Sequence, residues 1–380
     1  MMAGWEPYRL RGGRLLRRGY TTGTCAAAAA RGATQLLFTG RAPEMVAVIT
    51  PAGWEVEIEV KEPVLAGGEA RCCVTKDAGD DPDVTHGLDI CAVARALNTP
   101  GVVVRGGPGV GVVTRPGLGV GVGEAAINPV PLAMIRREAE KALPPGQGVE
   151  VTIIVPRGEE VASRTMNPRL GILGGISILG TTGVVEPMSE EAFRESLAPQ
   201  VAVAAAEGFR QIVMTPGRKG EKLAVERYGL PPGAVVQISN FVGYMLEEAA
   251  RQALEGVLLF GYHGKLAKVA AGVFHTHSRV ADARLETLAA HAALLGADRS
   301  VVAEIMQAHI GEAAVEVLRQ HGLMEVMPRI AAEASRRAEE YVGRRLRVGT
   351  VLLSLAGEAL GWDRGAEEIG RVLGWKPPSM

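Results

Sequence analysis

Beyond about Thr165, the chain alternates between short apolar runs and segments with the composition of helices. The apolar runs occupy residues 172–179, 211–214, 235–238 and 256–260. Helical segments such as 189–207 and 221–228 separate them. Short apolar strands that alternate with helices are typical of a parallel sheet covered on both faces. We therefore predict a Rossmann-like parallel α/β domain over residues 166–380, with a helix-rich region after residue 280.

The first 165 residues follow a different pattern and complete a two-domain α/β protein. Between Met45 and Thr75, alternating apolar residues separated by Pro and Gly turns predict antiparallel strands. Helices are expected to start near Asp81 and Asn128, because each is followed by proline, and an Asp or Asn cap before Pro is typical of a helix start. The sequence thus predicts an N-terminal α+β domain with antiparallel strands over residues 1–165.

Charge and cysteine content limit the classes of protein to consider. The chain has 41 Lys and Arg against 42 Asp and Glu, a net charge of −1, so it lacks the basic field of nucleic-acid-binding proteins. No apolar stretch reaches the roughly 20 residues of a membrane span. The four cysteines form no CxxC pair and are expected to be reduced and buried. We therefore expect a cytoplasmic protein with no nucleic-acid or membrane partner.

Small and polar residues follow each apolar run of the second domain. In an open parallel sheet, ligands bind beyond the carboxyl ends of the strands, so these loops are expected to converge on one crevice. Glycine there lets a ligand approach the backbone closely, and helix N-termini present free N–H groups. Ordinary strand-to-helix turns are the alternative for any single loop. The predicted cofactor-binding residues are Gly180, Thr181, Thr182, Gly183, Thr215, Gly217, Ser239, Asn240, Gly261 and His263.

The segment from Lys76 to Gly87 carries four aspartates and one histidine. Asp81 and Asp83 are explained by the expected helix start, as its cap and as a carboxylate in its first turn. The remaining acidic residues have no such explanation, and the histidine would lie opposite the buried face of that helix. An ordinary polar surface is the alternative. The predicted catalytic residues are Asp77, Asp80 and His86.

A basic loop precedes the expected first helix. Arginines are frequent between residues 9 and 18, and the sequence GYTTGT follows at residues 19–24. Arginine beside a helix N-terminus is suited to binding carboxylates, with surface solvation as the alternative. The sequence pair His275 and His277 lacks a third ligand nearby, so no protein-bound metal is predicted. The predicted substrate-binding residues are Arg17, Arg18, Thr21, Thr22, Lys76 and Lys265.

Six segments together carry a resemblance to a known family. They are Arg18–Ala28, Lys76–Gly87, Asn128–Pro131, Gly174–Gly183, Phe241–Met245 and Phe274–Ser278. In this order, and over most of the chain, they resemble the CbiD family, the cobalt-precorrin-5B (C-1)-methyltransferases of anaerobic cobalamin (vitamin B12) biosynthesis. The resemblance implies S-adenosyl-L-methionine as methyl donor, cobalt-precorrin-5B as acceptor and cobalt-precorrin-6A as product. It also implies that the cobalt is carried by the tetrapyrrole substrate and not by the protein.

The resemblance does not identify catalytic residues, so the assignments above stand on the residues themselves. Methyl transfer from a sulfonium mainly requires that two reactants be held in position and that water be excluded. The donor is expected in the α/β half, and the Lys76–Gly87 segment is expected to face the tetrapyrrole. Transient contact with neighbouring pathway enzymes is a further expectation, and the oligomeric state is left open.

Two other functions are kept as alternatives. A nicotinamide-dependent reductase could use the same crevice, although GVGEAA at residues 121–126 is only a formal dinucleotide fingerprint without its βαβ unit. A non-enzymatic carrier of a tetrapyrrole intermediate could bind through the same polar loops. An S-adenosylmethionine-dependent mass gain of one methylene on the tetrapyrrole would discriminate between the three.

Overall fold

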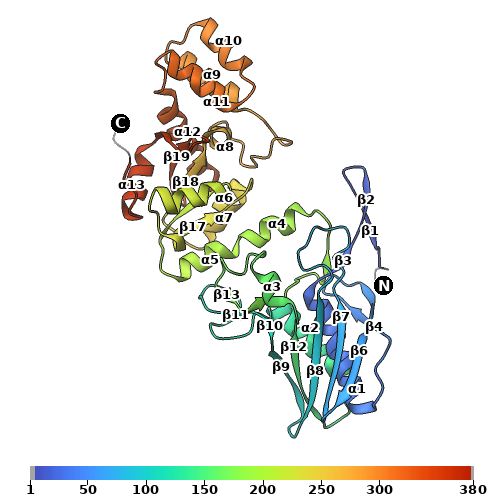
Figure 1. Cartoon of the computed structure of the whole chain (residues 1–380). Helices are drawn as coiled ribbons and strands as arrows, with labels where there is room; N and C mark the ends of the chain where they lie inside the picture. Colours follow the sequence, from blue (N-terminus) through green and yellow to red (C-terminus); the bar gives the residue numbers. More distant parts are fainter. Residues whose placement is uncertain (1–4, 378–380) are drawn as a thin grey trace. The chain divides into compact units, whose positions relative to one another are not determined.

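The computed structural model describes residues 5–377 and divides the chain into two compact units. Unit 1 extends to Ala192 and unit 2 begins at Phe193 (Figure 1). The sequence predicted the boundary earlier, between residues 165 and 166. The difference arises because the apolar run 172–179 pairs with strands of unit 1 instead of starting the sheet of unit 2.

Unit 1 is built on a five-stranded mixed sheet. Its strand order is β6-β7-β8-β12-β9, and every neighbouring pair is antiparallel except β12 with β9, which is parallel. The strands are β6 (Lys61–Ala66), β7 (Glu69–Thr75), β8 (Asp89–Leu97), β12 (Gly148–Ile154) and β9 (Gly101–Gly106). Unit 1 therefore contains antiparallel strands mixed with helices, as the sequence predicted.

Helices α1 (Thr22–Thr39) and α2 (Pro129–Ala142) pack together over one face of this sheet. The run Ala26–Ala30 in α1 is fully buried, and its small side chains allow close packing against the strands. Helix α2 begins with Asn128 in the N-cap position and Pro129 as its first residue, as the sequence predicted. The same core contains Cys72, Val74 and Ile90 from β7 and β8.

Short strand pairs complete unit 1, together with the single-turn helix α3 (Gly158–Ala162). The antiparallel pairs are β1 (Tyr8–Arg11) with β2 (Arg14–Arg17), β3 (Gly19–Tyr20) with β15 (Val184–Val185), β4 (Met45–Ile49) with β5 (Glu55–Glu59), and β11 (Val112–Val113) with β13 (Ile172–Leu173). Strand β10 (Gly109–Val110) pairs in parallel with β14 (Gly175–Ile176).

Unit 2 contains a second five-stranded sheet with the order β17-β16-β18-β19-β20. The first four strands are parallel and the last is antiparallel. They are β17 (Val235–Gln237), β16 (Gln211–Thr215), β18 (Gly256–Tyr262), β19 (Arg347–Leu353) and β20 (Ala359–Trp362). Three of the four predicted apolar runs therefore form parallel strands of one sheet.

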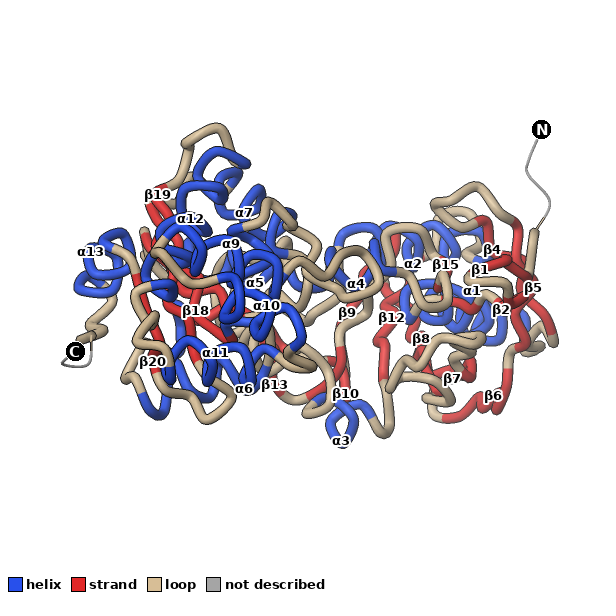
Figure 2. The backbone as a smooth tube through the Cα atoms, turned by 90° about the horizontal axis from the view of Figure 1, so that it is seen from above, coloured by secondary structure: helices blue, strands red, loops and turns tan. Residues whose placement is uncertain are grey.

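Helices cover both faces of this sheet (Figure 2). On one face, Ser335 donates to the hydroxyl of Thr350, whereas the neighbouring Val351 packs with Ala366 and Ile369 on the other face. The helices that lie within unit 2 are α5 (Pro199–Ala206), α6 (Arg218–Lys222), α7 (Val242–Arg251), α8 (His263–Ala270), α9 (Arg284–Leu294), α10 (Arg299–Gln307), α11 (Gly311–Gln320), α12 (Val326–Tyr341) and α13 (Arg364–Val372), with a π-helical turn at Leu223–Arg227 and a 3₁₀ turn at Pro232–Ala234. Helix α4 (Glu190–Leu197) crosses the boundary between the units. The predicted helix-rich region after residue 280 is present as α9 to α12 (orange and red in Figure 1).

The helix expected near Asp81 is not formed. Residues 80–87 are a series of turns, and the next element is strand β8. The Asp81 carboxylate accepts a hydrogen bond from the distant backbone N–H of Met188 at 2.8 Å instead of capping a helix. The Asp81 side chain, which the local sequence suggested as a helix cap, is therefore engaged in a long-range contact instead.

The expectation that all cysteines are reduced is also wrong. Cys73 on β7 and Cys91 on β8 lie directly opposite each other and form a disulfide. Cys25 and Cys72 are buried free thiols, as predicted. The antiparallel register of β7 and β8 brings the pair together, and the spacing of the cysteines in the sequence carried no sign of it.

Candidate functional site

The Lys76–Gly87 segment of unit 1 is a loop closed at its base by the backbone. Lys76 N–H donates to the Leu88 carbonyl, and Gly87 N–H donates to the Lys76 carbonyl, each at 2.8 Å. Inside the loop, the Lys76 ammonium donates to the Asp83 carboxylate at 2.6 Å, and the Lys76 side chain is only 2% exposed. Burial alone would raise the pKa of Asp83, but Lys76 and Thr85 lower it below its usual value. Lys76, a predicted substrate-binding residue, thus holds the loop together.

The two predicted catalytic aspartates bind Arg17, the last residue of β2. The Arg17 guanidinium donates two hydrogen bonds to the Asp77 carboxylate, and Arg17 N–H donates to Asp80 Oδ2 at 2.6 Å. Asp77 also accepts from Gly79 N–H at 2.9 Å. The hydrogen bonds from Arg17 lower the pKa of Asp77 below its usual value, despite partial burial. Asp77 is therefore ionised at neutral pH and is a weak base.

His86 has a defined tautomer in the neutral state. Ala78 N–H donates to His86 Nδ1 at 3.0 Å, so the proton of the neutral ring is on Nε2. The side chain is 54% exposed and its Nδ1 lies 3.8 Å from Asp77. The neutral ring can donate a hydrogen bond from Nε2 but cannot accept one there. This geometry favours a hydrogen-bond donor over a general base.

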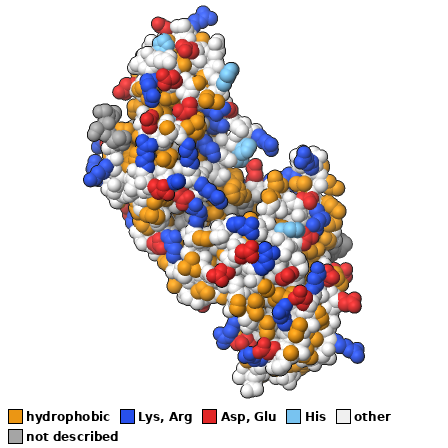
Figure 3. Space-filling view, in the orientation of Figure 1, with side chains coloured by type: hydrophobic (Ala, Val, Ile, Leu, Met, Phe, Trp, Pro, Cys, Tyr) orange, Lys and Arg blue, Asp and Glu red, His pale blue; other side chains and the backbone are white. Residues whose placement is uncertain are grey.

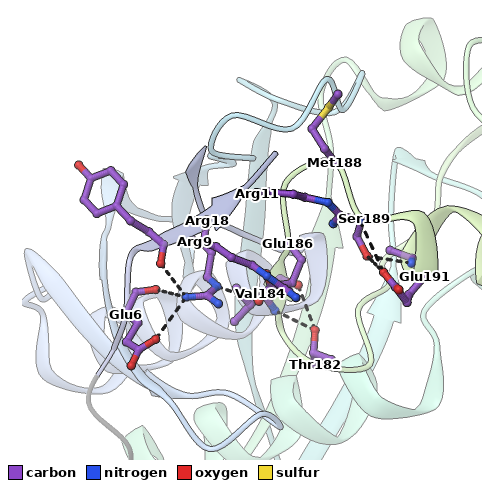
Figure 4. A network of polar contacts seen from close by, with 12 residues as sticks. Glu6, Arg9, Arg11, Arg18, Thr182, Val184, Glu186, Met188, Ser189 and Glu191 are labelled. Atoms are coloured by element: carbon purple, nitrogen blue, oxygen red, sulfur yellow. Dashed lines mark hydrogen bonds and ion pairs between the residues drawn. The ribbon is translucent and has the colours of Figure 1, made fainter. Parts of the chain in front are cut away.

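Arg18 lies in an internal network (Figure 4). Its Nε donates to Glu186 at 2.7 Å, and its Nη1 donates to the carbonyls of Glu6 and Tyr8 at 2.6 and 3.1 Å. Arg9 donates to the same Glu186 carboxylate at 2.8 Å. With its side chain only 9% exposed, Arg18 ties the N-terminal hairpin to the end of unit 1. Arg17 is the more accessible of the two predicted arginines, at 39%.

Thr21 and Thr22 anchor residues 177–183 at the N-terminus of α1. Thr21 caps the helix by accepting from Thr24 N–H at 3.3 Å. The hydroxyl of Thr22 accepts from Leu179 N–H at 2.9 Å, and that of Thr24 donates to the Gly183 carbonyl at 2.6 Å. The predicted cofactor loop Gly180, Thr181, Thr182 and Gly183 therefore belongs to unit 1, whereas the other three loops belong to unit 2.

Those three loops lie at the carboxyl edge of the unit 2 sheet. Strand β17 lies on one side of β16 and β18 lies on the other. The order in which the chain adds strands to the sheet therefore reverses between the parallel strands β16 and β18. Such a reversal is the usual ligand site of an open parallel sheet. Thr215 is the last residue of β16 and Gly217 lies just beyond it, Ser239 and Asn240 follow β17, and Gly261 and His263 lie at the end of β18. The Lys265 ammonium joins two of the loops by donating to Asn240 Oδ1 at 2.9 Å and to the Pro216 carbonyl at 3.4 Å.

Buried polar atoms without partners gather at this edge. Thr215 and His263 are both fully buried, and neither the Thr215 hydroxyl nor either ring nitrogen of His263 has a hydrogen-bond partner among the described residues. Burial lowers the pKa of His263 to about 4, although the nearby Glu312 opposes the shift. Native proteins rarely leave such atoms unpaired, so each one is a candidate for contact with a ligand.

Sequence reasoning missed Glu312. It lies in the first turn of α11, its Oε1 is 3.5 Å from His263 Nε2, and the same oxygen accepts from Leu355 N–H. Nothing in the local sequence around residue 312 distinguishes it from a solvated helix residue. Its proximity to His263 depends on how residues 280–322 pack.

The remaining candidate chemistry is limited. Burial raises the pKa of the Cys25 thiol to about 12, so it is no nucleophile at neutral pH.

On the face that Figure 3 shows, Lys and Arg are interspersed with Asp and Glu, without a uniformly basic surface. Over residues 5–377, no helix is long and apolar enough to cross a membrane.

We expect His263 to make folding sensitive to mild acid. The unfolded chain takes up its proton near pH 6.5, whereas the folded ring does so only near pH 4, so stability is complete above pH 6.5 and declines as the pH falls through this window. Between pH 7 and 4.5 this group should cost about 2 kcal/mol of unfolding free energy. Urea unfolding of His263→Asn should therefore show a shallower pH dependence than that of the unaltered chain.

The exposed His309 on the same unit provides the control. His309→Asn should retain the pH dependence of the unaltered chain. If His263→Asn has the same pH dependence as both, the ring is not held neutral by burial.

Comparison with known proteins finds relatives that match nearly the whole chain. The CbiD family model matches residues 10–187, and the model of the CbiD C-terminal domain matches residues 275–364. A protein of Moorella thermoacetica named cobalt-precorrin-5B C(1)-methyltransferase is 51% identical over 93% of this chain and 97% of its own length. One of the same name from Thermoanaerobacter sp. is 45% identical over 94% of this chain and all of its own.

One solved structure is also similar. The crystal structure of a cobalamin biosynthesis protein (cbiD) from Archaeoglobus fulgidus is 33% identical, covers 72% of this chain and 86% of that one, and gives a TM-score of 0.38. The family models and the sequence identities together establish that the chain belongs to the CbiD family.

Proposed function

We propose that this chain is an S-adenosylmethionine-dependent enzyme that methylates C-1 of cobalt-precorrin-5B, giving cobalt-precorrin-6A. The observation that carries the proposal is the 51% identity, over 93% of the chain, to a relative named cobalt-precorrin-5B C(1)-methyltransferase. Cobalt enters as part of the substrate. We further propose a cytoplasmic location and transient contact with neighbouring pathway enzymes.

The donor site that we propose is the carboxyl edge of unit 2, as in a Rossmann-like domain. The donor supplies a methyl group already activated by its sulfonium, so the protein has to bind, orient and exclude water. The reversal of strand order between β16 and β18 supports this location, as do the unpartnered Thr215 and His263. Gly217 supports it further, because a Cβ built there meets no atom within 4 Å.

The tetrapyrrole site that we propose is the surface around the Lys76–Gly87 loop. His86 Nε2 and the accessible part of Arg17 supply a neutral donor and a cation that suit the carboxylate-fringed macrocycle. Asp77 and Asp80 act as positioning residues through their bonds to Arg17. Lys76 and Arg18 support the same loop and hairpin from inside the unit.

Incubation of the purified chain with cobalt-precorrin-5B and S-adenosylmethionine tests the function directly. The tetrapyrrole should gain the mass of one methylene, and with methyl-labelled donor the label should appear at C-1. Binding of the tetrapyrrole without any mass gain would indicate a carrier. Dependence on a nicotinamide cofactor would indicate a reductase.

Gly217→Val tests the donor site. The residue has an extended φ of 167° and open space at its Cβ position, so the substitution should leave the melting temperature unchanged. A bulky side chain there should keep the donor from the backbone and weaken S-adenosylmethionine binding, measured by calorimetry, about tenfold or more.

Gly183→Val provides a contrasting variant. Gly183 has φ +79° and a Cβ position 2.9 Å from Thr50 and Pro51, so this change should destabilise unit 1. Unchanged donor affinity in a folded Gly217→Val protein would place the donor elsewhere.

His86→Asn tests hydrogen-bond donation by the loop. The Asn carbonyl can still accept from Ala78 N–H, whereas the Nε2–H is lost. Loss of this hydrogen-bond donor to the reacting tetrapyrrole should lower kcat about 100-fold with unchanged affinity for S-adenosylmethionine. Asp80→Asn, which keeps an acceptor for Arg17 N–H, should change kcat much less. Near-normal kcat in His86→Asn would make the loop purely structural.

A further inference from the structure

Glu312 is a carboxylate without a Lys or Arg partner among the described residues, at the carboxyl edge of the unit 2 sheet. Its Oε1 accepts from Leu355 N–H and faces His263 Nε2 at 3.5 Å. Among the described residues, its Oε2 makes no hydrogen bond, and neither oxygen forms an ion pair with Lys or Arg. The side chain is 28% exposed, so the second oxygen can be reached from solvent.

The charged groups near Glu312 pair with other residues or are neutral. Burial keeps the pKa of His263 low, so the ring is uncharged at neutral pH. Arg284, whose charge also reaches this histidine, forms an ion pair with Asp282 at 2.9 Å. Lys265 donates to Asn240 and Pro216, at the ends of β17 and β16. A half-buried carboxylate with a free oxygen and no cationic partner favours a cationic ligand.

The surroundings of Glu312 also point to a ligand. His263 is fully buried, its Nδ1 has no hydrogen-bond partner, and the only polar group recorded near its Nε2 among the described residues is Glu312 at 3.5 Å. Its Cε1 lies close to the backbone of Gly311, where a Cβ would be 2.8 Å away. Tyr262 packs edge-on against this ring with 4.5 Å between centroids. Helix α11 is therefore seated directly on the end of β18, next to the reversal of strand order. Glu312 thus belongs to the same edge as the proposed donor loops.

We propose that Glu312 binds the ammonium group of the amino-acid part of S-adenosylmethionine, so that helix α11 completes the donor site. This inference rests on the proposed donor-dependent function. A primary ammonium has three N–H donors and suits a carboxylate oxygen that lacks a partner. The sulfonium is also cationic but has no N–H to donate. The ammonium is therefore the better match to a carboxylate that is already oriented by one hydrogen bond.

Calorimetry with three ligands and Glu312→Gln tests this assignment. S-adenosylmethionine has both cations, S-adenosylhomocysteine has only the ammonium, and 5′-methylthioadenosine has neither. Glu312→Gln should weaken the first two by about 10- to 100-fold and leave the third unchanged. The Gln carbonyl can still accept from Leu355 N–H, so α11 should stay in place. A melting temperature equal to that of the unaltered chain would confirm this.

Glu316→Gln is the matched control. Glu316 lies one turn further along α11, is 53% exposed and pairs with Arg319 on the surface, so all three affinities should stay unchanged. Weaker binding of S-adenosylmethionine alone in Glu312→Gln would assign the carboxylate to the sulfonium and overturn the inference. Equal loss for all three ligands, or no loss for any, would overturn it as well. If the unaltered chain binds no S-adenosylmethionine, the donor-dependent function itself fails.

Discussion

A backbone contact between two segments of unit 1 determines the geometry of its candidate site. A Cβ at Gly19 would lie 2.2 Å from the carbonyl carbon of Ala78, and one at Gly79 would lie 2.2 Å from the Arg17 carbonyl oxygen. Only glycine allows the chains to approach so closely. This approach places the Arg17 guanidinium against Asp77 and lets Arg17 and Asp80 exchange backbone and side-chain hydrogen bonds. The orientation of His86 depends on this close approach, because its Nδ1 accepts a hydrogen bond from the N–H of Ala78, the residue that lies against Gly19.

The order of strands has the corresponding role in unit 2. Because strand order reverses between β16 and β18, the connections that leave these two strands run to opposite sides of the sheet. The three loops and helix α11 lie at the carboxyl ends of these strands. The fully buried His263 remains neutral because desolvation disfavours its charged form more strongly than Glu312 favours it. Burial of a neutral ring, rather than an ion pair, therefore leaves the carboxylate of Glu312 available.

Sequence patterns correctly predicted those strands whose formation depends on neighbouring residues along the chain. The runs 211–214, 235–238 and 256–260 are continuous apolar stretches bounded by loops, and each became a parallel strand. Failures occurred where a distant partner overrode the local signal. Asp81 and Pro82 look like a helix start, but Asp81 binds Met188 N–H instead. The run 172–179 is apolar enough for a core strand, yet its glycines let it pair in two short pieces with β10 and β11. Cys73 and Cys91 meet only through strand register.

The same distinction applies to the candidate residues. Charged residues with conspicuous sequence signals, such as Lys76, Arg18 and Asp77, are largely engaged in internal pairs. An ion pair inside a folded unit costs desolvation and is retained when it fixes a loop or hairpin in one arrangement. Unused bonding capacity lies at Nε2 of His86 and at the backbone of Gly217, which the sequence also indicated, and at Oε2 of Glu312, which it did not. Chemistry with an external ligand requires unused bonding capacity, so the residues that define the shape of this protein differ from those that are free to bind.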